Sequence, residues 1–329
     1  MLRPRRGRVR HPETLPVRRR PSLGSGLLRV PRALLIANPV AARTDEATRH
    51  RVVKLLERAG WRTEIAVTRG PHDAAVLAGQ AARDGTDVVA VFGGDGTTMR
   101  AAASLVGTDV ALALIPGGTG NLLAGNLRIP SDPLRAARVI VSGRRRGIDL
   151  GRVNLPDGAH YFGVACGAGI DARVMGETAM IDKRRWGIGA YMATTLRMLP
   201  EMRSTACTVT VDGHPLETPA ALVLIMNCGE IIPPLLRVRR EISPEDGVLD
   251  LIAIAADSPW QGIRGFMRVL LNTAGDIRET PHVRYARGTR FTVESVPTLP
   301  VQFDGEPVGS TPFTAEVVPR ALTVLTAGD

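Results

Sequence analysis

Residues 87–97 read DVVAVFGGDGT and residues 110–121 read VALALIPGGTGN, and these two stretches decide the fold. Each is a short apolar run that leads into a glycine-rich loop, and a helical pattern follows each loop. Continuous apolar runs of this length are typical of strands covered on both faces, as in a parallel sheet. The two stretches therefore predict neighbouring strand-helix units of an open α/β sheet.

The same alternation extends towards the N-terminus. Strands are expected at residues 33–38 and 63–68, and helices at residues 45–59, 72–83, 97–105 and 121–127. This succession predicts a parallel, Rossmann-like three-layer α/β domain with right-handed crossovers.

The pattern changes after about Arg146. Alternating stretches rich in Gly, Val and Thr then predominate, at residues 159–164, 207–211, 220–227, 248–253, 289–293, 300–303 and 313–318. They are typical of antiparallel strands, and two helical patches interrupt them near residues 188–199 and 259–272. We therefore expect a second, β-rich domain, either a sandwich or a barrel. The chain divides into an arm at residues 1–32, a nucleotide-binding α/β domain at 33–146, a β-rich substrate domain at 147–319 and a C-terminal segment at 320–329, which is a candidate to return to the first domain.

Composition supports a two-domain globular protein. The chain has 329 residues, of which 44% are hydrophobic and 22% charged, and a domain typically holds about 150 residues. No apolar run reaches the roughly 18 residues that a membrane-spanning helix needs. A secretory signal peptide is not expected, because Arg29 and Arg32 interrupt the apolar stretch after the basic arm, so the expected location is the cytoplasm.

The net charge of +10 is concentrated in the arm. Residues 1–32 contain ten arginines, five prolines and one acid, Glu13, so the rest of the chain is nearly neutral. The prolines argue against a long helix. The arm is either an unstructured extension or a segment attracted to anionic phospholipid at the inner face of the membrane. Nucleic-acid binding is not expected, because no aromatic residue lies among the arginines to stack on bases.

The spacing of the cysteines and histidines does not indicate a metal-binding site. Cys166, Cys207 and Cys228 are widely separated, and they are interpreted as small core residues. The six histidines show no spacing typical of metal ligands.

The two glycine loops are suited to binding phosphate. Glycines remove the Cβ atoms that would keep a phosphate away from backbone N–H groups, and a helix N-terminus adds free donors. Glycine pairs are also common in ordinary turns, but here two such loops each follow a strand and precede a helix. Asp95 and Thr97 are able to serve Mg²⁺ or phosphate.

Other nucleotide folds fit less well. The chain has only two lysines, Lys54 and Lys183, and neither lies in a Walker A motif. The protein-kinase motifs and the G-x-S-x-G hydrolase motif are absent. Residues 167–172 match a loose dinucleotide fingerprint, but they follow the α/β region, so we interpret them as a turn.

Motifs along most of the chain resemble those of the bacterial diacylglycerol kinase and sphingosine kinase family of lipid kinases. They are Asn38-Pro39, Thr68, GGDGT at 93–97, PGGTGN at 116–121, PEDGVLDL at 244–251 and FDGEP at 303–307. GGDGT alone is shared with NAD kinases, whereas the full series over residues 33–320 is more specific. The resemblance implies an α/β domain followed by a β-sandwich, with ATP in the cleft between them and the γ-phosphate passed to a lipid hydroxyl.

The resemblance also implies roles for individual residues. Nucleotide binding falls to Asn38, Thr68, Gly93, Gly94, Asp95, Gly96, Thr97, Gly118, Thr119 and Asn121. A structural Mg²⁺ would be held by Asp246 and by the backbone carbonyls near Leu249 and Leu251. Asp95, Asp304 and Glu306 are the catalytic candidates, and the D-G-E at 304–306 would supply the general base.

The spacing of Asp304 and Glu306 leaves two interpretations. On a strand, side chains two residues apart share a face, so both carboxylates could join one proton relay. Glu306 is then the favoured proton acceptor and Asp304 its partner. The alternative is a D-G hairpin turn without a chemical role. In the same way, Asp246 belongs either to a Mg²⁺ site or to a plain turn.

The chain departs from the family pattern beside the first loop. Members commonly continue after GGDGT with an aliphatic residue and then Asn-Glu, whereas this chain has Thr98-Met99-Arg100. The first loop reads NPVAAR, and Leu122 follows PGGTGN where Asp is common. Arg43 and Arg100 are candidates to compensate by binding phosphate.

The acceptor is expected to be a lipid, diacylglycerol or a sphingoid-like molecule. Residues that could form an apolar entrance are Met175, Met180, Trp186, Tyr191, Met192, Met198, Ile231 and Ile232, although core packing is the commoner fate of such side chains. Lys183-Arg184-Arg185 beside Trp186 would suit contact with a membrane surface, and a homodimer is compatible with the sequence. The alternatives are an NAD kinase-like enzyme and a catalytically silent regulator that binds nucleotide or lipid.

Overall fold

The computed structural model describes residues 29–155, 158–169, 203–233, 236–239, 241–256, 258, 260, 261, 264 and 282–328. The arginine-rich arm up to residue 28, the predicted helical patch near residues 188–199 and most of the one near residues 259–272 lie outside this part.

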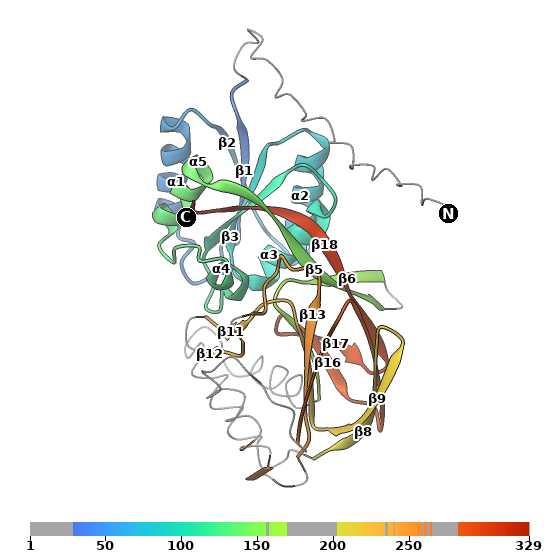
Figure 1. The fold of residues 1–329 in the computed structure, drawn as a ribbon. Coiled ribbons are helices and arrows are strands. Elements are labelled where there is room, and N and C mark those ends of the chain that lie inside the picture. The colour runs from blue at the N-terminus through green and yellow to red at the C-terminus, as the bar shows by residue number, and fades with distance from the viewer. Residues whose placement is uncertain are drawn as a thin grey trace, which may run out of the picture. The chain divides into compact units, whose positions relative to one another are not determined.

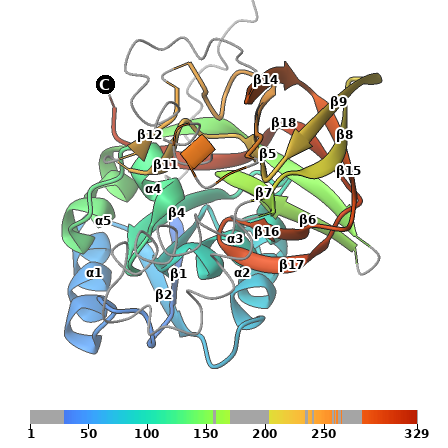
Figure 2. The same ribbon diagram turned by 90° about the horizontal axis from the view of Figure 1, so that it is seen from below.

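The N-terminal domain is a parallel sheet with helices on both faces, as the sequence predicts (Figure 1). Its strands are β1 (Arg32–Ala37), β2 (Arg62–Val67), β3 (Val88–Gly93) and β4 (Ala111–Pro116), paired in the order β2-β1-β3-β4. Its helices are α1 (Glu46–Arg58), α2 (Asp73–Arg83), α3 (Asp95–Leu105), α4 (Leu122–Asn126) and α5 (Pro133–Ser142). Helix α1 packs against α5 and α2 packs against α3, and Figure 2 shows the two pairs on opposite sides of the sheet.

Two helices differ from the sequence expectation. Helix α3 begins at Asp95, two residues before the expected start at Thr97, because Gly94 occupies the N-cap position. Helix α5 was not expected, although Asp132 caps it by accepting a bond from the Arg135 N–H and Pro133 occupies its first turn. Both residues are common helix-start signals.

The C-terminal domain is an antiparallel β-sandwich, which settles the sandwich-or-barrel alternative. One layer continues the first sheet through β5 (Arg144–Leu155), β6 (Gly158–Phe162), β8 (Thr205–Val211), β9 (His214–Ala220), β15 (Arg290–Val296) and β18 (Phe313–Thr326). The other has the order β14-β13-β10-β7-β16-β17, with strands β14 (Val283–Gly288), β13 (Leu249–Ile254), β10 (Leu222–Met226), β7 (Ala165–Gly169), β16 (Pro300–Phe303) and β17 (Glu306–Ser310). A short hairpin of β11 (Glu230–Ile232) and β12 (Leu236–Arg237) pairs separately.

Two long strands run through both domains. The C-terminal part of β18 pairs in parallel with β4 through Val324 and Leu112, whereas its N-terminal part pairs with β15. Strand β5 is antiparallel to β18 along both parts. Residues 31–329 accordingly form one compact unit. The domain limits expected from the sequence stay a prediction.

The structure corrects the interpretation of the loose dinucleotide fingerprint as a turn, because the first residues of the fingerprint lie in strand β7. Residues 165–169 are fully paired, with β10 on one side and β16 on the other. Gly169 lies so close to its neighbour that a Cβ there would be 2.4 Å from the Ala221 carbonyl oxygen. Small residues therefore permit a crowded central strand at residues 167–169, whereas residues 170–172 of the fingerprint lie outside the described part.

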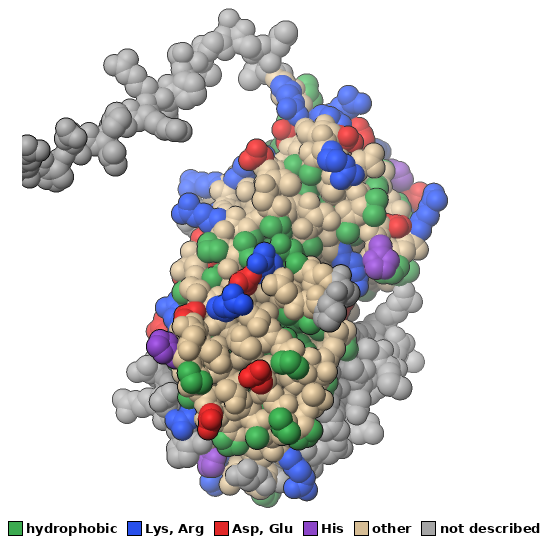
Figure 3. Space-filling model, turned by 90° about the vertical axis from the view of Figure 1, so that its right-hand side faces the viewer, with side chains coloured by type: hydrophobic (Ala, Val, Ile, Leu, Met, Phe, Trp, Pro, Cys, Tyr) green, Lys and Arg blue, Asp and Glu red, His purple; other side chains and the backbone are tan. Residues whose placement is uncertain are grey.

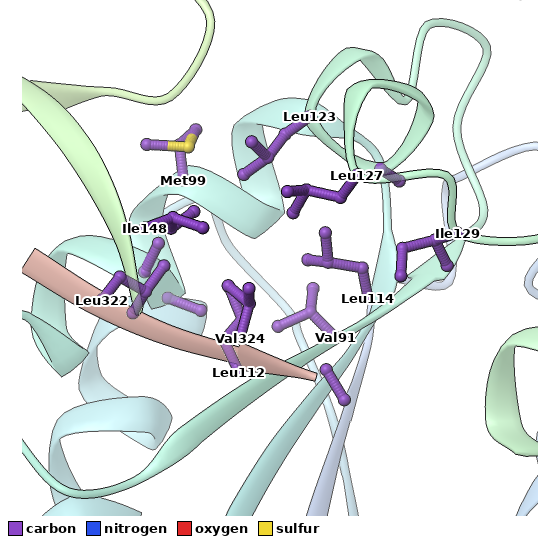
Figure 4. Close-up of a cluster of buried hydrophobic side chains, with 14 of the residues drawn as sticks. Val91, Met99, Leu112, Leu114, Leu123, Leu127, Ile129, Ile148, Leu322 and Val324 are labelled. Carbon is purple, nitrogen blue, oxygen red and sulfur yellow. The ribbon is translucent and has the colours of Figure 1, made fainter. Parts of the chain in front are cut away.

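Two hydrophobic clusters support these layers. The larger one fills the N-terminal domain and includes Val91, Leu112 and Leu114 from its strands together with Leu322 and Val324 of β18 (Figure 4). The smaller one lies within the sandwich. The three cysteines are buried and form no disulfide, as expected of core residues.

Surface charge is mixed on the face seen in Figure 3, where Lys and Arg side chains lie among acidic ones. In the described part of the chain, no helix is both long and apolar enough to cross a membrane.

Candidate active site

The two glycine loops lie against each other at the carboxyl ends of β3 and β4. Gly93 pairs with Pro116, and its carbonyl accepts bonds from the N–H groups of Gly117 (2.8 Å) and Gly118 (3.2 Å). A Cβ on Gly118 would lie 2.6 Å from the Gly94 Cα, which is closer than carbon atoms can approach. The loops therefore form one continuous backbone surface because both positions lack a side chain.

Backbone donors are exposed along this surface at the start of α3. The first N–H groups of a helix have no partner within the helix, and the N-terminal end of the helix dipole is positive. No side chain caps α3, because its N-cap residue is Gly94. Asn38, at the end of β1, donates a bond to the Thr97 hydroxyl (2.9 Å) and so ties the neighbouring strand to this turn. Thr68 lies at the end of β2, where its N–H bonds the Ala37 carbonyl.

The second loop is closed by Asn121. Its side chain accepts a bond from the Gly118 N–H (3.0 Å) and donates one to the Gly118 carbonyl (2.7 Å), while its backbone is left-handed with φ of 50°. Thr119 is exposed at the tip of this loop. Asn121 therefore shapes the loop, whereas Thr119 is available to a ligand.

Asp95 joins the two loops. Its carboxylate accepts a bond of 2.6 Å from the Leu122 N–H at the start of α4. A Cβ on Gly120 would be 2.8 Å from the second carboxylate oxygen, Oδ2, so glycine is required there as well. Removal from water raises the pKa of Asp95, and the backbone donors around it counteract this only in part.

Asp304 lies in a hairpin turn, which corrects the same-face arrangement with Glu306. Phe303 pairs with Glu306, and the two residues between them have positive φ values, 45° at Asp304 and 87° at Gly305. This is the type I′ turn that a D-G pair favours. The turn also positions a chemical group, because the Asp304 carboxylate accepts bonds from three backbone N–H groups of residues 163–165, at 2.6 to 2.9 Å.

The environment of Asp304 raises the pKa of its carboxyl group. Desolvation raises its pKa to about 6, and the nearby negative charge of Asp95 adds to the shift in the same direction. The three N–H donors oppose the shift. Asp95 and Asp304 come from different domains, and both line one cavity of about 180 Å³.

Glu306 and Arg100 pair at the edge of this cavity. The Arg100 guanidinium donates to both carboxylate oxygens, at 2.8 and 3.0 Å. Arg100 is thus engaged with Glu306, which differs from the expectation that it binds phosphate. The opposite side of the cavity is less polar and is formed in part by Met99, Tyr161 and Phe303.

The Mg²⁺ site expected at Asp246 stays a prediction, and the contacts of Asp246 in the structure argue against it. Its carboxylate pairs with Arg287 and accepts a bond from the Val248 N–H, and the guanidinium also lies 3.8 Å from Asp250. Leu249 and Leu251 lie in β13, where Leu251 is in register with both neighbouring strands. Within the described ranges, no three His, Cys, Asp or Glu side chains gather to bind a metal. A hard cation would have to displace Arg287, so these residues do not fit a Mg²⁺ ion.

Most of the expected lipid entrance lies outside the described residues. This holds for Met175, Met180, Trp186, Tyr191, Met192 and Met198, and for the basic run at 183–185. Ile231 packs against the hydrophobic core, so it follows the commoner interpretation of such residues. The side chain of Ile232 is also outside the described part.

Sequence reasoning missed two features of the site. One is the backbone of residues 163–165, which holds Asp304 from about 140 positions away and leaves no local signal. The other is the ion pair between Arg100 and Glu306, which the sequence did not indicate.

The fold and the site define a class of protein that combines a glycine-loop α/β domain with a β-sandwich. The family described as the diacylglycerol kinase catalytic domain matches residues 32–153. The YegS C-terminal NAD kinase beta sandwich-like domain matches residues 164–326.

Individual relatives agree with this class. A diacylglycerol kinase of Mycobacterium tuberculosis (strain H37Rv) is 31% identical over 287 residues, which cover 84% of this chain and 88% of the relative. One from Bacillus subtilis (strain 168) is 28% identical, over 85% of this chain and 91% of the relative. A crystal structure of a "putative diacylglycerol kinase" from Bacillus anthracis str. Sterne aligns with a TM-score of 0.75 at 25% identity, covering 90% of this chain and 96% of that one. The chain belongs to the diacylglycerol kinase family of lipid kinases.

Proposed function

We propose that this protein transfers the γ-phosphate of Mg²⁺-ATP to a free hydroxyl of diacylglycerol or a closely related lipid. The observation that carries the proposal is the convergence of the two glycine loops and two carboxylates, Asp95 and Asp304, on one cavity. Phosphoryl transfer requires mainly positioned phosphates, neutralised charge and a base beside the attacking hydroxyl.

The nucleotide would bind along the glycine loops. Its phosphates would accept bonds from the free N–H groups at the start of α3 and from Thr119, with Asn38, Thr68, Gly93, Gly94, Gly96, Thr97, Gly118 and Asn121 shaping the surface. Mg²⁺ would arrive with ATP as part of the substrate. Asp95 is the carboxylate nearest to this surface that is able to meet it.

The acceptor hydroxyl would enter from the cavity. Its oxygen forms the new bond to the γ-phosphorus while the bond to the bridging oxygen of ADP breaks, and its proton passes to a carboxylate. We propose Asp304 as the acceptor of this proton in place of Glu306, which the sequence favoured, because burial raises the pKa of Asp304 to about 6 and a guanidinium holds Glu306. The cavity holds a head group only, since 180 Å³ is too small for acyl chains.

A lipid substrate implies work at a membrane surface. We propose a cytoplasmic protein that contacts the inner face of the membrane peripherally, with the arginine-rich arm attracted to anionic lipid. The chemistry calls for no nucleic acid partner, and a homodimer remains compatible with it.

Two other functions share parts of the site. An NAD kinase-like enzyme would use the same GGDGT loop, but the Asn-Glu element is absent and FDGEP is present. A silent regulator would have no need for two carboxylates with raised pKa values in one cavity.

A lipid panel tests the proposal. The purified chain is incubated with Mg²⁺ and γ-labelled ATP, with diacylglycerol or a long-chain base in mixed micelles and with NAD in parallel. We expect label in lipid, and a loss of at least about 100-fold in kcat for Asp304→Asn. Glu217→Gln, an exposed acid on β9, is the matched control and should keep full activity. Label in NADP, or no transfer despite nucleotide binding, would refute the lipid kinase assignment.

A further inference from the structure

Arg100 and Glu306 join the two domains directly. Arg100 lies on α3 of the N-terminal domain, and Glu306 is the first residue of β17 in the C-terminal domain. The guanidinium meets both carboxylate oxygens, at 2.8 and 3.0 Å. One guanidinium nitrogen, Nη2, donates both bonds, so the contact joins the two domains through a single donor atom.

The ion pair lies over the first turn of α3. A Cβ on Gly96 would be 2.3 Å from Glu306 Oε1 and 3.2 Å from an Arg100 nitrogen, so only glycine leaves room for the pair. The same turn carries the backbone donors of the proposed phosphate site. The pair is therefore beside the reacting groups, and it borders the cavity that Asp95 and Asp304 line.

The pair is poorly suited to stabilising the fold. The Arg100 and Glu306 side chains are 35% and 52% exposed, and exposed ion pairs contribute little to stability. Its position suggests a different role. Glu306 is separated from Asp304 by one residue in a tight turn, so a fixed Glu306 also fixes where the Asp304 carboxylate stands relative to α3.

Charge gives the pair a second effect. Asp95, Asp304 and Glu306 would present three carboxylates to an incoming triphosphate, and Arg100 neutralises one of them.

We infer that Arg100 is a positioning residue that holds the 304–306 hairpin, through Glu306, at the reacting distance from the phosphate site. The inference rests on the proposed kinase function. It assigns Glu306 a tethering role and leaves proton transfer to a buried carboxylate.

The test is a charge exchange. Arg100→Gln removes the charge, Arg100→Lys keeps the charge on a shorter side chain with one nitrogen, and Arg100→Glu with Glu306→Arg reverses the pair. We expect Arg100→Gln to lower kcat about 10²-fold, as for a misplacement of about 1 Å, with the KM for ATP changed less than about threefold. The kcat of Arg100→Lys should lie between those of Arg100→Gln and the parent. The kcat of the reversed pair should be at least about tenfold higher than that of Arg100→Glu alone.

Three results would contradict the inference that Arg100 positions the hairpin. Arg100→Gln with kcat within about twofold of the parent would overturn the inference. A reversed pair no better than Arg100→Glu would also overturn it, because Glu306 would then be needed for its own carboxylate. A rise in the KM for ATP at unchanged kcat would make Arg100 a phosphate ligand instead.

Hydrogen exchange separates this inference from the kinase proposal, since it needs no lipid. The Gly305 and Glu306 amides should exchange faster in Arg100→Gln and return towards the parent rate in the reversed pair. Unchanged exchange in Arg100→Gln would refute the tether. A parent protein that phosphorylates no lipid, yet shows this exchange pattern, would refute only the kinase proposal.

Discussion

Replacing Gly118 with alanine should separate the two glycine loops. The added Cβ would lie 2.6 Å from the Gly94 Cα, 3.4 Å from the Gly94 nitrogen and 3.3 Å from Asn121 Oδ1. Carbon atoms in contact normally stand about 3.5 to 4.0 Å apart, so the loops must move by about 1 Å. The nearest atom belongs to the backbone, and no rotamer change can relieve the clash.

The expected effect is larger on activity than on stability. Overpacking of this kind typically costs about 1–3 kcal/mol in the free energy of unfolding, which urea denaturation measures. A displacement of about 1 Å between reacting groups lowers kcat about 10²-fold. Binding of Mg²⁺-ADP, followed by calorimetry, should weaken as well, because the donors at the start of α3 move relative to Thr119.

Gly309→Ala is the matched control. Gly309 has no heavy atom within 4 Å of the Cβ position and is not among the positive-φ glycines. We expect it to keep the stability, nucleotide affinity and activity of the parent. If Gly118→Ala bound Mg²⁺-ADP and turned over as Gly309→Ala does, contact between the loops would not form the phosphate site.

Four further outcomes are expected. If Asp304 accepts the proton, kcat/KM should rise about tenfold per pH unit below its pKa of about 6 and level off above it, since only the ionised form is a base; a profile flat from pH 5 to 8 would contradict this role. The same raised pKa means that the contribution of Asp304 to stability is greatest below about pH 4 and is lost as the pH rises through 6. Glu230→Ala should lower the free energy of unfolding by about 2 kcal/mol in urea titrations, because the 4% exposed Glu230 side chain bridges Arg128 and Arg237; a loss below about 0.5 kcal/mol would show that the bridge is not needed. Because Arg287 already neutralises Asp246, EDTA should leave the Tm of the nucleotide-free protein within about 1 °C, and a larger fall would restore the case for a structural metal.

The strands of the N-terminal domain could be predicted because their signal is local. The apolar runs of β3 and β4 are covered on both faces, so all of their residues are buried. The glycine loops could be predicted for a similar reason, since a loop between a parallel strand and a helix lies at the carboxyl edge of the sheet. Strand β7 could not, because its small residues are explained only by the crowding of strands β10 and β16 on either side.

The hairpin at 304–306 shows where local sequence stops being informative. The D-G pair was compatible with a plain turn and with a chemical role; the structure shows the turn, together with backbone bonds that position the Asp304 carboxylate. Asp304 is a candidate base because it lies near Asp95 and accepts bonds from residues 163–165. Asp95 and residues 163–165 are distant from Asp304 in the sequence. The sequence spacing therefore identified Asp304 as a candidate residue, but its prediction that Asp304 and Glu306 share one face of a strand was wrong.

The distance between Asp95 and Asp304 depends on how the two domains are joined. Strands β5 and β18 pass through both domains, and at their register shift Asp149 accepts bonds of 2.7 Å from the N–H groups of Gly247 and Arg320. Asp149 is almost fully buried, so water cannot replace these bonds easily. The paired strands thus form one rigid connection. The exposed pair of Arg100 and Glu306 forms a second connection at the cavity, and because such a pair is weak on its own, it positions the hairpin only while the strands hold the domains in register.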